Sequence, residues 1–410
     1  MEWGDTEGVV AHEGGLQMTG TKMNFEISPE QEAIQESVAA ICAQFTDDYW
    51  LAKDRDGSFP EEFYRALADG GWLGICIPEE YGGSGLGITE AALMNQAVAE
   101  SGAGMSGASC MQANIFGLNS VVVFGTEEQK QRMLPPIAQG KAKACFAVTE
   151  PNTGLNTTQL KTRAERKGDR YVVNGQKVWI SVAQVATKIL LLARTTPLEE
   201  VKKPTHGLSL FYTDLDRSRI SVRTIEKMGR SAVDSNELFI ENFEIPVEDR
   251  IGEEGEGFRY ILHSMNPERV LLAADAIGLG KAALRKASAY AKERVVFGRT
   301  IGQNQSIQHP LAENWMELEA ARLMMLYAAW QYDNGMPCGA AANSAKYLAA
   351  EAGLKACQTA VMTHGGFGYA KEFHVERYLR EIMIPWIAPV SPNMIKSYIA
   401  ERVLGQAKSY

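Results

Sequence analysis

The sequence predicts an α+β fold in which a helical segment, an all-β segment and a second helical segment follow one another. Helical patterns dominate from residue 28 to about residue 142, and long patterns rich in Ala, Leu and Met return after residue 257. Between them, short apolar stretches bounded by Gly, Asn and Asp indicate strands. Helices and strands kept in separate runs are typical of α+β proteins. We expect an N-terminal helical domain, a middle β domain and a C-terminal helical domain, at residues 23–144, 145–252 and 253–410.

Local start and turn signals define the first helical domain. Residues 28–30 (Ser-Pro-Glu) combine an N-cap, a first-turn proline and a first-turn acid, and residues 60–62 (Pro-Glu-Glu) open a second helix. A glycine-rich turn at residues 78–85 separates two helices. Residues 1–22 carry acids and glycines without apolar periodicity, so we expect a disordered leader there, with neither a secretory core nor a transit-peptide pattern.

The middle segment contains alternating patterns typical of strands. Residues 171–180 predict a strand, an Asn-Gly turn and a second strand. Further short strands are expected at residues 188–194, 207–214, 220–224 and 237–245.

Charge and composition exclude several functional classes. A net charge of −9 argues against a nucleic-acid-binding protein, which needs a basic surface. No run of about 18 apolar residues occurs, so we expect no membrane span. The six cysteines are dispersed without a CxxC pair and the six histidines are scattered. This pattern argues against a disulfide framework and a metal site, and it favours a reducing compartment.

Five short motifs follow one another along the chain. Residues 125–130 read Gly-Thr-Glu-Glu-Gln-Lys, residues 146–151 read Phe-Ala-Val-Thr-Glu-Pro, and residues 178–181 read Val-Trp-Ile-Ser. Arg-x-x-Phe-Gly-x-x-Ile-Gly-x-x-Gln follows at residues 294–305, and His-Gly-Gly-Phe-Gly-Tyr at residues 364–369. In this order and at this spacing, the motifs resemble the acyl-CoA dehydrogenase family over nearly the whole chain after the leader.

The resemblance implies the acyl-CoA dehydrogenase-like fold, with a β-barrel as the middle domain, and FAD as the cofactor. It also implies α,β-dehydrogenation of an acyl-CoA thioester to the trans-2-enoyl-CoA, with electrons passed to an electron-transferring flavoprotein. The compartment is then the bacterial cytoplasm or, in a eukaryote, the mitochondrial matrix. Acyl chain length, branching and polarity stay open, as does the reaction direction. In the first half of the chain, the residues that match the family's FAD contacts are Phe146, Val148, Thr149, Trp179 and Ser181.

Three of these residues suit a flavin for physical reasons of their own. Thr149 offers a hydroxyl and backbone donors to the polar edge of the flavin. Trp179 is large enough to cover an isoalloxazine ring, with stacking worth roughly 0.5–1.5 kcal/mol beyond area burial. Ser181 lies two residues further along the predicted strand, so it faces the same side and can donate toward flavin N5. For Trp179 alone, the alternative of a side chain in the barrel core stays open.

A second group of residues implies that subunits share FAD. Arg294 matches the family arginine that binds the FAD pyrophosphate, and a guanidinium pairs with phosphate oxygens bidentately. Phe297, Gln305, Gly365 and Gly366 match groups that hold the FAD of the neighbouring subunit, where glycine lets the backbone approach a ligand closely. The resemblance therefore implies an obligate homo-oligomer, for which we expect a homotetramer.

The catalytic base is displaced from its most frequent place in the family. Most members carry a glutamate near the C-terminus, but residues 387–393 read Ile-Ala-Pro-Val-Ser-Pro-Asn, and no Asp or Glu occurs between Glu381 and Glu401. A subset of the family, including isovaleryl-CoA and long-chain dehydrogenases, carries the base on a helix after the barrel. Glu268 and Arg269 match the Glu-Arg pair of that helix. We expect Glu268 to be the base.

The competing interpretation of Glu268 is structural. With Asn266 as N-cap and Pro267 in the first turn, Glu268 would be an ordinary acid at the start of a long helix. A helix N-terminus lowers the pKa of a carboxyl group, so burial by bound acyl-CoA would have to raise it. On the catalytic interpretation, Asn266 and Arg269 lie at the substrate.

Departures from the family pattern leave other functions open. Leu155 stands where the family has a serine near the pantetheine, although it remains a predicted substrate contact. The position of the usual glutamate falls on Pro389 or Val390, and if Pro389 occupies it, the backbone N–H that helps to polarise the thioester carbonyl is missing. Ser391 is the residue of this segment that we expect at FAD. The alternatives are an enoyl-CoA reductase, an acyl-CoA oxidase, a desulfinase-like lyase and a non-catalytic flavoprotein subunit.

Overall fold

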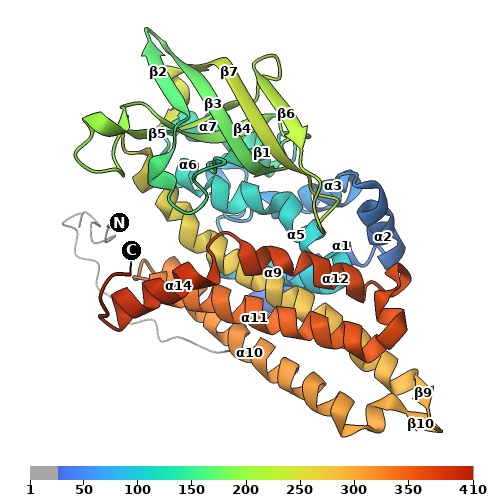
Figure 1. Cartoon of the computed structure of the whole chain (residues 1–410). Helices are drawn as coiled ribbons and strands as arrows, with labels where there is room; N and C mark the ends of the chain where they lie inside the picture. The colour runs from blue at the N-terminus through green and yellow to red at the C-terminus, as the bar shows by residue number, and fades with distance from the viewer. Residues whose placement is uncertain (1–25, 410) are drawn as a thin grey trace.

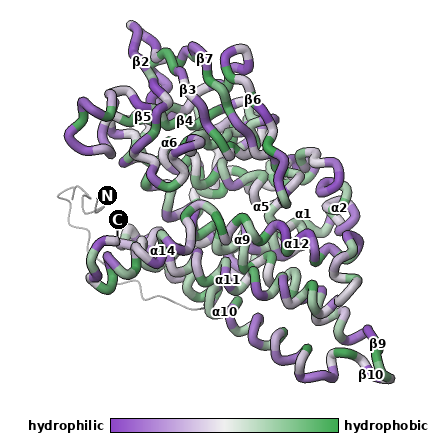
Figure 2. Tube along the Cα trace, viewed as in Figure 1, coloured by the Kyte–Doolittle hydropathy of each residue, from purple (hydrophilic) through white to green (hydrophobic). Residues whose placement is uncertain are grey.

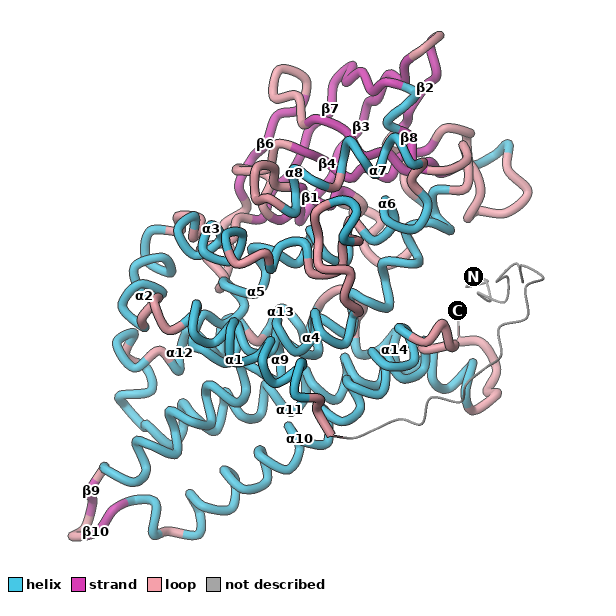
Figure 3. Tube along the Cα trace, turned by 180° about the vertical axis from the view of Figure 1, so that it is seen from behind, coloured by secondary structure: helices cyan, strands magenta, loops and turns pink. Residues whose placement is uncertain are grey.

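The computed structural model describes residues 26–409 and confirms the predicted α+β fold class. A sheet-rich domain lies at one end of the molecule, N-terminal helices lie against it, and long C-terminal helices extend to the opposite end (Figure 1). Seen from behind, the strands gather at one end, apart from one small hairpin at the other (Figure 3). The leader predicted at residues 1–22 lies outside the described residues.

The N-terminal domain begins as predicted, but a helix that the sequence did not indicate lies between the first two expected helices. Ser28 caps the first helix through a capping box with Gln31. The helix that starts at Glu61 is the third, because the sequence analysis missed a charge-rich second helix whose buried apolar residues are only Trp50 and Leu51. The helices are α1 (Pro29–Cys42), α2 (Asp47–Asp56), α3 (Glu61–Asp69), α4 (Ile88–Val98), α5 (Gly104–Gln112), α6 (Asn119–Phe124), α7 (Glu127–Met133) and α8 (Pro135–Ala138).

Helices α4, α5 and α6 form one bent helical stretch. Wider helical turns at Ala99–Ala103 and Ala113–Gly117 connect them, and Gly102 adopts a positive φ of 109° at the first bend. The stretch Ile88–Phe124 is long and apolar enough to cross a membrane by length and composition, but 67% of its apolar window is buried inside the protein. Such burial is typical of a core helix.

The sheet domain lies at the positions that the alternating patterns indicated. The strand order is β6-β7-β3-β2-β4-β5-β8, and β1 pairs with β4 in parallel. The strands are β1 (Ala144–Ala147), β2 (Arg163–Lys167), β3 (Arg170–Ser181), β4 (Lys188–Arg194), β5 (Leu208–Asp214), β6 (Ile220–Thr224), β7 (Ser235–Pro246) and β8 (Arg250–Ile251).

The Asn-Gly turn predicted within residues 171–180 is wrong. Strand β3 continues through Gly175, and its register against β7 shifts there instead of reversing. The hairpin turn lies earlier, between Lys167 and Arg170. Gly175 is required by close packing, because a Cβ atom there would lie 2.4 Å from Thr162 Oγ1 and 2.7 Å from Thr162 Cα.

Strands β4 and β5 are buried on both faces, which explains their continuous apolar sequences. Alternate side chains of β4 enter different clusters: Leu190 and Leu192 pack toward the N-terminal helices, and Ile189 and Leu191 pack inside the sheet domain. The first cluster also contains Phe258 at the start of the next helix. The sheet is therefore fixed rigidly to both helical domains.

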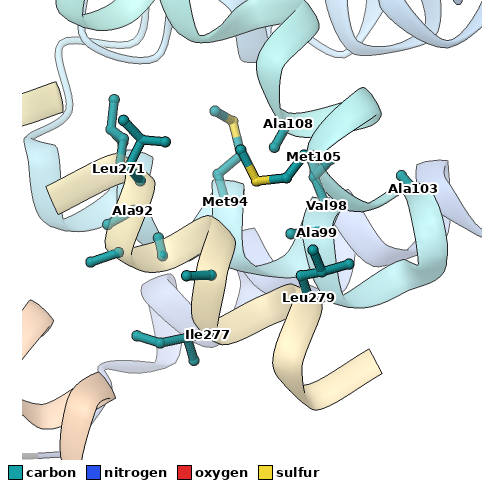
Figure 4. Close-up of a cluster of buried hydrophobic side chains, with 14 of the residues drawn as sticks. Ala92, Met94, Val98, Ala99, Ala103, Met105, Ala108, Leu271, Ile277 and Leu279 are labelled. Carbon is teal, nitrogen blue, oxygen red and sulfur yellow. The ribbon is translucent and has the colours of Figure 1, made fainter. Parts of the chain in front are cut away.

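The C-terminal domain is a bundle of long helices. Met94 and Met105, from α4 and α5, pack beside Leu271 and Leu279 of helix α9 in the largest buried cluster (Figure 4). The elements are α9 (Gly257–Glu293), β9 (Val295–Val296), β10 (Arg299–Thr300), α10 (Gln305–Asp333), α11 (Gly339–His364), α12 (Val375–Glu381), α13 (Met383–Ile387) and α14 (Pro392–Tyr398).

The change Gly175→Ala tests the bulge in β3. The new Cβ would collide with the backbone of Thr162, so we expect the free energy of unfolding to fall by about 1–3 kcal/mol. Gly154→Ala is the control, because a Cβ there meets nothing within 4 Å. Thermal melting followed by circular dichroism measures both variants, and equal melting temperatures would contradict the account of Gly175.

Candidate active site

A buried ion pair fixes the loop that follows β1. The Lys177 ammonium on β3 lies 3.1 Å from Glu150 Oε1 and donates a hydrogen bond of 2.9 Å to the carbonyl of Val148. The Glu150 carboxylate also accepts from the backbone N–H groups of Lys161, at 2.7 Å, and Thr162, at 2.9 Å. Three donor groups therefore fix this loop against β3 through four contacts.

The surroundings of the pair keep both groups charged at neutral pH. Burial lowers the pKa of Lys177 to about 8, against the opposing effect of the Glu150 charge. Burial alone would raise the pKa of Glu150, but the Lys177 charge and the backbone donors outweigh it and hold that pKa below its usual value. Removing one partner would leave the other charge unpaired in the interior, so a substitution of either residue strongly destabilises the fold.

A backbone hydrogen bond joins Thr149 to Val178, the residue before Trp179. The backbone N–H of Val178 donates to the carbonyl of Thr149 over 3.0 Å. The register of β3 shifts between Lys177 and Ile180, and Trp179 lies in that bulge with a positive φ of 62° and 58% of its surface exposed. The alternative that Trp179 is barrel core is therefore wrong. A large aromatic side chain held outward in a rarely populated conformation is typical of a binding site.

The other residues predicted for the flavin end lie near Trp179 in the chain. Ser181 ends β3, and its hydroxyl accepts a hydrogen bond of 2.9 Å from Arg230. Phe146 on β1 packs edge-on against Phe116, with 5.2 Å between ring centroids. Val148 is buried.

The second predicted group gathers around the end of α9. Arg294 follows the last residue of α9, and its guanidinium lies 5.7 Å from the centroid of Phe367, beside Gly365 and Gly366. Phe297, at the tip of the β9–β10 hairpin, is 101% exposed. Hydrophobic residues mark this tip at the far end of the molecule (Figure 2). Gln305 is the first residue of α10.

The two predicted groups lie far apart within one chain. The sheet and the β9–β10 hairpin stand at opposite ends of α9 (Figure 1). That helix has 37 residues, which corresponds to about 55 Å at 1.5 Å per residue. Within one chain, the structure therefore does not place Arg294 beside Trp179.

The expected helix start at Asn266 is wrong, and so is the structural interpretation of Glu268 that depended on it. Helix α9 begins at Gly257 and passes through Pro267 without interruption. A proline inside a helix leaves the carbonyl four residues earlier without its usual donor. Here the side chain of Asn119 donates to that carbonyl, the one of His263, over 3.2 Å. Glu268 therefore lies in the fourth turn, away from the helix N-terminus.

Burial within the protein sets the acidity of Glu268. It raises the pKa of Glu268 to about 7, although the charges of Arg269 and Lys346 oppose the shift. Bound acyl-CoA is not required for the shift, which corrects the sequence-based expectation. Within residues 26–409 the Glu268 carboxylate accepts no hydrogen bond, and it is only partly buried. Asn266 accepts a hydrogen bond of 2.9 Å from Arg269 instead of capping a helix.

Lys346 on α11 connects Glu268 with the segment that carries the base in most of the family. Its buried ammonium donates to the carbonyls of Val390, at 2.7 Å, and Trp386, at 3.3 Å. The hydroxyl of Ser391, the next residue, caps α14. The segment thus lies close enough to Glu268 for both to interact with one cation, and the sequence analysis did not identify Lys346 at all.

The remaining candidates are simple to place. Leu155 is 48% exposed in the loop after Glu150. Among the described residues, no group of three or more His, Cys, Asp or Glu side chains could hold a metal ion.

Comparison with known proteins identifies the family. The N-terminal, middle and C-terminal domain profiles of acyl-CoA dehydrogenases match residues 28–141, 145–243 and 255–404. The chain belongs to the acyl-CoA dehydrogenase family. Acyl-CoA dehydrogenase FadE12 of Mycobacterium tuberculosis is 35% identical over 394 residues, which cover 95% of this chain and 100% of the relative.

Solved structures of acyl-CoA dehydrogenases share the fold over nearly the full length. Butyryl-CoA dehydrogenase from Megasphaera elsdenii is 28% identical with a TM-score of 0.88, and the match covers 93% of this chain and 100% of that one. A glutaryl-coenzyme A dehydrogenase in complex with glutaryl-CoA is 31% identical with a TM-score of 0.89, covering 94% and 98%.

The protein is thus a flavin-dependent oxidoreductase whose cofactor is FAD, and its residues fit that group. Trp179 presents an exposed aromatic face, while Thr149 and Ser181 are partly exposed beside it. Arg294 has an exposed guanidinium for phosphate oxygens, and Gly365 and Gly366 leave open space around the backbone. These features match the ring end and the phosphate end of FAD, respectively.

The change Lys346→Met tests the electrostatics of Glu268. Losing the cation removes stabilisation of the carboxylate, so the pKa of Glu268 should rise above about 7. If Glu268 is the expected base, flavin reduction by an acyl-CoA depends on its ionised carboxylate, so the pH profile of that reduction should shift to higher pH. Stopped-flow absorbance from pH 6 upward measures the profile. The control Lys355→Met removes a half-exposed lysine from the same helix, and identical profiles for Lys346→Met and this control would contradict the assignment.

Proposed function

We propose that this chain dehydrogenates an acyl-CoA thioester to the trans-2-enoyl-CoA, with Glu268 as the α-proton base. Electrons then pass to an electron-transferring flavoprotein. The observation that carries the proposal is the position of Glu268: a carboxyl within an uninterrupted helix, partly accessible, without a hydrogen bond among the described residues, and with a pKa raised by burial to about 7. A base works best when its pKa lies near the working pH.

The chain's own residues perform the proton-transfer half of the reaction. The ionised Glu268 carboxylate accepts the proton as the Cα–H bond breaks, and the positive charges of Arg269 and Lys346 keep enough of it ionised at neutral pH. When bound, FAD supplies the acceptor for the hydride that leaves Cβ. Trp179 covers one face of the site and limits access of water to it.

We also propose that FAD is bound between subunits. The ring-end residues and the phosphate-end residues lie at opposite ends of α9, so one chain does not offer both ends to one cofactor. A second copy supplies the missing end, which supports a homo-oligomer and is compatible with the expected homotetramer. The exposed Phe297 beside Arg294 is the apolar surface that such a copy would cover.

The change Glu268→Gln tests the proposal. It keeps the shape of the side chain and removes the basic oxygen, so the FAD content should survive. Turnover should fall at least 10²–10⁴-fold, the range for a positioned acid–base group. Glu293→Gln, at the exposed end of the same helix, is the matched control and should leave turnover unchanged.

The readout is anaerobic bleaching of the flavin under a panel of acyl-CoA thioesters. Near-normal bleaching by Glu268→Gln would place the base elsewhere. No bleaching of the wild-type protein by any acyl-CoA would favour the non-catalytic or the reductive alternative, and aerobic peroxide formation would indicate an oxidase.

A further inference from the structure

We propose that Arg230 is a positioning residue that orients the Ser181 hydroxyl toward the flavin and places a positive charge behind it, which raises the reduction potential of bound FAD. The inference rests on the proposed binding of the flavin ring at Trp179 and Ser181. Arg230 lies outside the five sequence motifs that indicated the family.

The contacts of Arg230 are few and specific. Its Nη2 donates to Ser181 Oγ over 2.9 Å and to Ser235 Oγ over 3.0 Å. Since the guanidinium has only donors, it occupies an acceptor position of the Ser181 oxygen. The Ser181 proton is therefore free to point away from Arg230, where the flavin of the proposed function would accept it.

The backbone around Ser181 adopts rarely populated conformations. Only six non-glycine residues among those described have positive φ, and three of them surround Ser181: Trp179 at 62°, Val182 at 66° and Arg230 at 57°. Positive φ is a genuine outlier for a β-branched residue such as Val182. Such conformations persist only where the surrounding structure enforces them, and they gather at functional sites.

The loop that carries Arg230 is fixed from the helical domains. It connects β6 to β7, and the hydroxyl of Ser231 donates to Asp54 on α2 over 3.1 Å. Arg380 on α12 pairs with the same carboxylate at 2.7 Å and donates to the carbonyl of Met228 at 3.2 Å. The guanidinium of Arg230 is thus held at the junction of the sheet and helical domains.

The charge of Arg230 has no direct counter-ion among the described residues. The side chain is 9% exposed, and its Nε has no hydrogen-bond partner. Burial lowers the pKa of Arg230, and this effect exceeds the opposing effect of the carboxyl groups of Glu381, Asp234 and Asp275. Each of these three carboxyl groups forms its hydrogen bonds with residues other than Arg230.

The three carboxyl groups have other partners. Glu381 accepts from Ser106 at 2.7 Å and lies 3.5 Å from Arg377. Asp234 accepts from the backbone of Gln184 and from Asn236. Asp275 accepts from Asn95 and Gln112, and burial raises its pKa, which disfavours its charged form. A buried cation without a paired anion stabilises negative charge nearby, and reduction adds electrons to the flavin.

The experiment compares the midpoint potential of FAD in the holoenzyme of the wild type, Arg230→Gln, Arg230→Lys and Ser181→Ala. Arg166→Gln, which removes an exposed arginine of β2, is the control for net charge. Dye-coupled reductive titration gives each potential, while absorbance and circular dichroism give FAD content and folding. We expect Arg230→Gln to lower the equilibrium constant for two-electron reduction at least tenfold, about 30 mV. Arg230→Lys should fall between it and the wild type.

The double variant Arg230→Gln/Ser181→Ala tests whether Arg230 acts on the flavin through the Ser181 hydroxyl. If Arg230 acts through Ser181, the two single changes should be less than additive in the potential. A wild-type potential in folded, FAD-loaded Arg230→Gln would overturn the inference. If that variant does not fold, a wild-type potential in Ser181→Ala overturns it equally. A wild-type protein that binds no FAD would instead contradict the proposed function itself.

Discussion

The buried ion pair between Lys177 and Glu150 is the constraint on which the flavin end of the site depends. It joins the loop after β1 to the middle of β3 without access to water, and backbone donors from residues 161 and 162 complete it. Because the pair is buried, Thr149, which precedes Glu150, and Trp179, two residues after Lys177, are held outward. A surface ion pair would contribute little, whereas here the cost of an unpaired interior charge enforces one arrangement.

A second constraint acts on the base. Helix α9 continues through Pro267 because Asn119 satisfies the carbonyl that the proline leaves without a donor. The helix thereby carries Glu268 into partly buried surroundings, where desolvation raises its pKa and two cations limit the rise. Lys346 links this position to the C-terminal segment that lacks an acid. The loss of the usual glutamate and the placement of Glu268 are therefore two features of one cluster.

Much of the fold followed from sequence patterns, and the failures have physical reasons. Strands β4 to β7 lie where alternation or continuous apolar runs indicated them, and the order of the motifs identified the family. The Asn174-Gly175 pair indicated a turn, but tertiary contact with Thr162 decided the role of the glycine. Asn266-Pro267 carried a helix-start signal that a distant side chain overrode. Arg230 and Lys346 carried no signal, because their roles arise from contacts between segments far apart in the chain.

The central claim is that Glu268 removes the α-proton, and hydrogen exchange tests it without any electron transfer. A 3-thia-acyl-CoA carries sulfur at the β position, so it cannot transfer a hydride but keeps its acidic α-hydrogens. Incubated in D₂O with the FAD-loaded protein, it should gain α-deuterium, which mass spectrometry detects. The account predicts exchange by the wild type and at least 10²-fold slower exchange by Glu268→Gln. Exchange by Glu268→Gln at the wild-type rate would contradict it.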